Sequence, residues 1–76
     1  MLVQVIFFKE WAQAYGGQAY TYRTALPLKR GDKVIAPTAS GDSFKALVVA
    51  VDVPETAVVN LGDGLLNITE YHEGGF

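Results

Sequence analysis

The stretch KVIAPTASGDSFKALVVAVDV, residues 33–53, decides the fold class. Its first four residues have the composition of a short strand, which Pro37 ends. Residues 39–43 form a turn of small and polar residues, of the kind that joins antiparallel strands. Residues 44–53 follow as the strongest strand, and five consecutive apolar residues in it predict a central strand buried on both faces.

The chain before this stretch also has the composition of strands. Residues 2–8 are rich in Val, Ile and Phe, and we expect the odd-numbered ones to share one face. Residues 19–24 alternate between aromatic and polar side chains, which is typical of a half-buried strand. Between them, residues 9–18 contain Gly16-Gly17 and are too short for a stable helix, so we expect one helical turn or a wide loop.

The chain after this stretch predicts two more strands, residues 57–60 and 65–71, separated by a tight turn at residues 62–64. We expect residues 72–76 to be a loose tail. Short strands separated by Gly and Pro turns, without an amphipathic helix, predict an all-β domain. The expected fold is a small antiparallel barrel, SH3-like or OB-like, with five or six strands in a single domain over residues 1–76.

The composition excludes several classes of protein. The chain has 76 residues, a net charge of -2 and no cysteine, so neither disulfides nor cysteine-bound metals contribute to its stability. A hydrophobic content of 50% with 18% charged residues is opposite to that of disordered chains. The apolar residues 2–8 follow no basic segment and are too few to span a membrane. We therefore expect a cytoplasmic protein without membrane contact.

The residues that usually carry catalysis are scarce. The single histidine, His72, lies near the expected tail, where a solvated surface role is the natural interpretation. Acidic residues near it have neither calcium-loop nor zinc-site spacing. Gly16-Gly17 lacks the pattern of a phosphate-binding loop. We expect no enzyme activity, no catalytic residues, no metal site and no cofactor.

Aromatic residues and charges are distributed unevenly. Six of the nine aromatic residues lie in the first 22 positions, and all six basic residues lie in residues 1–45. We expect Tyr20 and Tyr22 to fill the core, whereas Trp11 is either a lid over one end of the barrel or an exposed contact residue. Exposed aromatic residues and acidic side chains are typical anchors and steering groups of protein contacts. The candidate partner-binding residues are Phe8, Trp11, Tyr15, Asp63 and Glu70.

A second interpretation uses the basic residues of the same half. Cations beside aromatic side chains bind single-stranded nucleic acids by contacting the phosphates and stacking on the bases. The candidate nucleic-acid-binding residues are Arg23, Lys29, Arg30 and Lys33.

One motif resembles a known family. The sequence YTYR of residues 20–23, followed by LKRGDKVIAP of residues 28–37 and an apolar strand, is similar to the small amino-terminal barrel of the primosomal replication helicases. It also resembles short phage-encoded proteins of unknown function. The resemblance covers residues 3–51 and implies an SH3-like barrel; in the helicases that domain binds the 3′ end of a DNA strand.

Two functions follow from the sequence. The favoured one is a non-catalytic interaction module, a phage or mobile-element protein that engages a host or replication protein. The alternative is a single-stranded nucleic-acid-binding module. A homo-oligomer is compatible with both.

Overall fold

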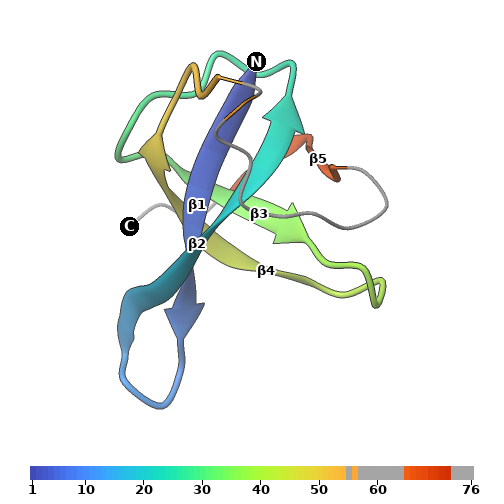
Figure 1. Ribbon diagram of the computed structural model, residues 1–76. Coiled ribbons are helices and arrows are strands. Elements are labelled where there is room, and N and C mark those ends of the chain that lie inside the picture. The colour runs from blue at the N-terminus through green and yellow to red at the C-terminus, as the bar shows by residue number, and fades with distance from the viewer. Residues whose placement is uncertain (55, 57–64, 73–76) are drawn as a thin grey trace.

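The structure, a computed structural model, describes residues 1–54, 56 and 65–72. Within these residues the chain forms one six-stranded sheet in the order β5-β2-β1-β4-β3-β6, without an α-helix (Figure 1). The strands are β1 (Leu2–Lys9), β2 (Ala14–Thr24), β3 (Lys33–Pro37), β4 (Ser43–Ala50), β5 (Asn67–Ile68) and β6 (Glu70–Tyr71). The predicted all-β class is confirmed.

The sheet is open and mixed, whereas we expected a closed antiparallel barrel. β5 pairs in parallel with β2, and β6 pairs antiparallel with β3. These two edge strands follow each other in the chain with only Thr69 between them, but no backbone pairing joins them. The expected strand over residues 65–71 is therefore two strands of two residues each, which change partner at Thr69. Each of the two strands adds only two residue pairs to an edge of the sheet, and the two edges stay unpaired with each other. The expected strand 57–60, the turn 62–64 and the tail after His72 lie outside the described residues.

The central hairpin forms as predicted, with one difference in burial. β4 lies between β1 and β3, and the turn after Pro37 joins β3 to β4. Ala46 and Val48 of β4 are buried on the inner face. Leu47 and Val49, which alternate with them, are only half-buried, so the expectation of burial on both faces was wrong. An apolar outer face therefore remains on the central strand.

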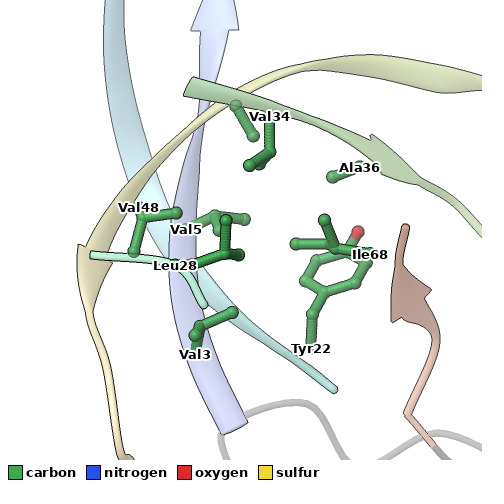
Figure 2. Packing of buried hydrophobic residues seen from close by; sticks show 9 residues of the cluster. Val3, Val5, Tyr22, Leu28, Val34, Ala36, Val48 and Ile68 are labelled. Carbon is green, nitrogen blue, oxygen red and sulfur yellow. The ribbon is translucent and has the colours of Figure 1, made fainter. Parts of the chain in front are cut away.

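The inner face of the sheet carries the core (Figure 2). It consists of Val3, Val5, Tyr22, Leu28, Val34, Ala36, Ala46, Val48 and Ile68. Ile68 is the largest fully buried residue, although its strand has only two residues. The buried Thr24 hydroxyl donates a hydrogen bond of 2.8 Å to the Ile68 carbonyl and accepts one of 3.0 Å from the Leu26 amide. These contacts fasten β5 to β2.

Tyr20 and Tyr22 of β2 both contribute to the core, as predicted. Tyr22 is 4% exposed, and Tyr20 packs against the buried residues from the side. The Tyr22 hydroxyl donates a hydrogen bond of 2.6 Å to the carbonyl of Pro37, the last residue of β3. A single side chain therefore connects β2 to β3, which are not neighbours in the sheet.

The turn before β3 is built by the motif residues themselves. Gly31 has a φ of +99°, a conformation that side chains with a Cβ rarely adopt. The Asp32 carboxylate accepts a hydrogen bond of 2.8 Å from the Lys29 amide, and the Asp32 amide donates one of 3.0 Å to the Lys29 carbonyl. The Gly31 amide then donates to the Val48 carbonyl, 2.8 Å away, which fixes the turn to β4.

β2 begins earlier than expected. Residues 14–18 belong to this strand, so the expected helical turn or wide loop over residues 9–18 shrinks to a loop of residues 10–13. The register between β1 and β2 shifts between Val5 and Phe7, and Gly17 lies near this bulge with a φ of +87°. Glycine inside a strand commonly marks such a bulge.

Candidate protein-binding surface

The β1–β2 hairpin ends in a short, well-bonded loop. The last strand pair joins Lys9 and Ala14. The Gln13 amide and the Gln13 side chain both donate to the Glu10 carbonyl, at 3.2 and 2.7 Å. Gln13 has a φ of +50°, which turns the chain back into β2. In Figure 1 this loop lies at the far end of the hairpin, away from the other strands.

Trp11 lies in this loop and is 87% exposed. A tryptophan in contact with water leaves a large apolar surface unburied. Of the two roles that the sequence left open, the exposed position is the one that the structure shows. A lid over the core requires burial, which Trp11 does not have.

Phe8 and Tyr15 form a cross-strand pair just behind this loop. Their ring centroids are 5.2 Å apart at an interplanar angle of 70°, which is an edge-to-face contact. The ammonium of Lys45, on β4, lies 4.3 Å from the centroid of the Phe8 ring, a cation–π distance. Burial raises the pKa of the Tyr15 phenol above its ordinary value of 10.0. The pair stiffens the hairpin that presents Trp11.

The strand registers extend this pair into a row across the outer face of the sheet. Lys45 is the partner of Ile35 on β3, and Ile35 is the partner of Glu70 on β6. Residues paired across neighbouring strands point to the same face. We call this set the outer row: Tyr15, Phe8, Lys45, Ile35 and Glu70.

A second line of side chains runs beside the outer row on the same face. Ile6 is paired with Leu47, and Leu47 with Lys33. All three are half-buried, so their side chains retain part of their accessible surface. Every strand of the described residues belongs to the same sheet, so no second sheet among them packs against this face. Leu2 and Thr21, at the other end of this face, are nevertheless buried. The half-buried part of the outer face around Leu47 is apolar, with Lys33 and Lys45 set into it.

The structure brings together three of the predicted partner-binding residues. Phe8 and Tyr15 are paired, and Trp11 lies at the tip of the same hairpin, whereas Glu70 lies on β6 at the other end of the outer row. Asp63 lies outside the described residues. Sequence reasoning missed Lys45 and Ile35, although the alternation within residues 33–36 and 44–47 indicates that they share a face once the hairpin is assumed.

The predicted nucleic-acid-binding residues do not gather around the aromatic side chains. Arg23 is the partner of Leu2, whereas Tyr15 is the partner of Phe8. Six residue steps separate these pairs along β1, which corresponds to about 20 Å. Lys29 and Arg30 are exposed in the turn before β3. Of the four, Lys33 alone lies next to the outer row.

Other kinds of site have little support in the described part of the chain. It contains no group of three or more His, Asp or Glu side chains arranged to hold a metal ion. None of its elements is a helix long and apolar enough to cross a membrane. Compared with protein-family models, curated proteins and solved structures, the chain has no match.

Proposed function

We propose that the chain is a non-catalytic protein-interaction module that contacts its partner through the β1–β2 hairpin. The observation that carries this proposal is the 87% exposure of Trp11 at the end of a hairpin. Trp is the residue most enriched among those that dominate protein interfaces, because it buries a large surface with few rotatable bonds.

The geometry behind Trp11 supports the same function. The loop hydrogen bonds to Glu10 and the Phe8–Tyr15 contact restrict the hairpin before any partner arrives. A partner then orders fewer groups on binding, and this reduces the entropy loss of association. The motif resemblance leads us to propose a host or replication protein as the class of partner, for a factor of phage or mobile-element origin.

The proposal is tested by site-specific photo-crosslinking. A photoreactive phenylalanine analogue is placed at Ala12, an exposed position beside Trp11, and the same analogue is placed at Ser40, an exposed position in the β3–β4 turn, as a matched control. We expect a protein adduct from position 12 only, which excess wild-type chain suppresses and excess Trp11→Ala chain does not. Equal labelling from both positions, or suppression by both competitors, would refute the proposal.

A single-stranded nucleic-acid-binding module is the second candidate. The observation that favours it is the exposure of Arg23, Lys29 and Arg30, three of the four predicted nucleic-acid-binding residues. Anisotropy of a labelled oligonucleotide at about 50 and 200 mM salt tests it, because phosphate-driven binding weakens steeply with salt. Salt-sensitive binding that is lost in Arg23→Gln and Arg30→Gln supports this candidate, and no binding at the lower salt excludes it.

A further inference from the structure

We propose that the outer face of the sheet binds an acidic, apolar segment of a partner protein. This inference rests on the proposed function and names the chemistry of the partner. The binding surface consists of the outer row together with Ile6, Leu47 and Lys33. A segment that fits it carries carboxylates for the two lysines and large aliphatic or aromatic side chains for the apolar residues between them.

The positive charge of the lysines on the outer face is the first reason to propose an acidic segment. Lys33 and Lys45 lie on neighbouring strands of the outer face, and each is the partner of an apolar residue, Leu47 and Ile35. Lys33 is paired with Leu47 on the β4 side, and on the β6 side its carbonyl accepts a hydrogen bond of 3.0 Å from the His72 amide. Glu70 lies at the far end of the outer row, beyond Ile35. The lysines therefore attract a carboxylate to the middle of the face, and Glu70 repels one from its edge.

Apolar surface is the second reason. Ile6, Ile35 and Leu47 are half-buried on a face without a second layer among the described strands. Large aliphatic side chains set among cations favour a ligand that is both apolar and anionic. Burial of such a side chain supplies affinity, and the carboxylates supply orientation.

The contacts of the Phe8 ring argue against the binding of a nucleic acid to this face. The Lys45 ammonium already lies over the ring at 4.3 Å, and Tyr15 contacts it edge-to-face. A base that stacks on an aromatic side chain needs a bare ring face. The aliphatic residues beside Phe8 and the carboxylate of Glu70 also give no favourable contact to phosphates. These features favour the peptide over the oligonucleotide.

The test is an amide chemical-shift titration of the isotope-labelled chain with three probes. The first is a synthetic peptide of alternating acidic and Leu or Phe residues, the second has the same sequence with Asn and Gln in place of the acids, and the third is a thymidine oligonucleotide of about 15 nucleotides. We expect the acidic peptide alone to shift the amides of Phe8, Ile35 and Lys45. No shift by the acidic peptide, or equal shifts by the neutral one, overturns the proposal.

Charge variants locate the binding. Lys45→Gln and Lys33→Gln are each expected to weaken the acidic peptide about two- to fivefold, as for other exposed ion pairs. Lys29→Gln makes the same change of charge in the turn outside this face and is expected to leave binding unchanged. An equal loss in all three variants shows attraction by total charge and overturns the proposal.

The outcomes separate this inference from the proposed function. If position 12 still crosslinks a protein while the acidic peptide does not bind, the hairpin function stands and the partner chemistry is wrong. If the oligonucleotide shifts the amides of the outer row, the peptide does not, and position 12 gives no protein adduct, both proposals fail.

Discussion

Removal of one hydroxyl, by Tyr22→Phe, tests how the strands of this open sheet are held together. The Tyr22 hydroxyl donates a hydrogen bond of 2.6 Å to the Pro37 carbonyl, and the residue is 4% exposed. Phe keeps the ring in the core but leaves the Pro37 carbonyl without this donor. We expect a loss of about 1.5 kcal/mol in the free energy of unfolding, which for this chain length lowers Tm by about 6–12 °C.

The same substitution changes how stability depends on pH. Burial, and then the charge of the neighbouring Tyr20, raises the pKa of Tyr22 above its ordinary value of 10.0. Above about pH 10 the unfolded chain releases this proton while the folded chain retains it, so the stability falls as the pH rises. This loss of stability is absent at pH values below the pKa that Tyr22 has in the unfolded chain. Tyr22→Phe removes the titrating group, so we expect the difference in stability between the two proteins to narrow as the pH rises above about 10.

Urea unfolding followed by circular dichroism measures both effects. Tyr71→Phe is the matched control, since Tyr71 is 40% exposed on β6 and is expected to change stability by less than about 0.5 kcal/mol. A Tyr22→Phe variant as stable as the wild type at pH 7 refutes the role of the bond. A gap that widens at alkaline pH refutes the assigned direction of the pKa shift.

Three further substitutions test the core, the turn and the attachment of β5. Val34→Ala removes part of a fully buried side chain and is expected to cost about 2 kcal/mol by urea unfolding, so a loss below about 0.5 kcal/mol contradicts its central position. Gly31→Ala places a Cβ on a residue with a φ of +99° and is expected to lower the free energy of unfolding by about 1–2 kcal/mol. Gly16→Ala is the control and should lower it much less, because Gly16 has open space around it and no positive φ. Equal losses in the two variants argue against backbone strain at Gly31. Thr24→Val breaks the hydrogen bond to the Ile68 carbonyl and is expected to speed amide exchange in β5 more than in β1, and uniform exchange contradicts this local role.

Much of the fold follows from hydrophobic patterns. The strand over residues 2–8, the turn after Pro37 and the central position of β4 follow from local composition and alternation. The early start of β2 does not follow from local composition, because Gly16-Gly17 has the composition of a loop. In the structure Gly17 lies close to Lys9, and an added Cβ there meets the Lys9 side chain at 3.2 Å. The two glycines accommodate a bulge between β1 and β2. This bulge depends on the pairing with β1 and not on the local sequence.

The partner switch at Thr69 has no local signal either. Two-residue strands are too short to show a period, so residues 65–71 appear as one strand from their composition. Only the positions of β2 and β3 in space decide which residue pairs with which strand. The position of Ile68 in the core then depends on the hydrogen bond to Thr24, a contact between residues 44 positions apart.

The candidate binding surface, like the fold, can be predicted only in part from the sequence. Phe8, Trp11 and Tyr15 can be selected from the sequence because they are aromatic and close to a glycine pair. Lys45 and Ile35 join them only through the register between β1, β4 and β3. A one-residue shift of that register turns both side chains to the inner face. A functional row across several strands is therefore a property of pairing, which composition alone does not contain.

The structure also separates what the family-like motif does from what the surface does. Leu28 and Val34 are buried, Gly31 and Asp32 form the turn, and the Pro37 carbonyl accepts the Tyr22 hydrogen bond. Each of these residues has a structural role that any chain with this arrangement of β2 and β3 requires. A motif made of such residues carries information about the fold and little about the ligand. The specificity of the chain therefore has to be sought in side chains outside the motif's fixed positions, above all Trp11 and the outer row.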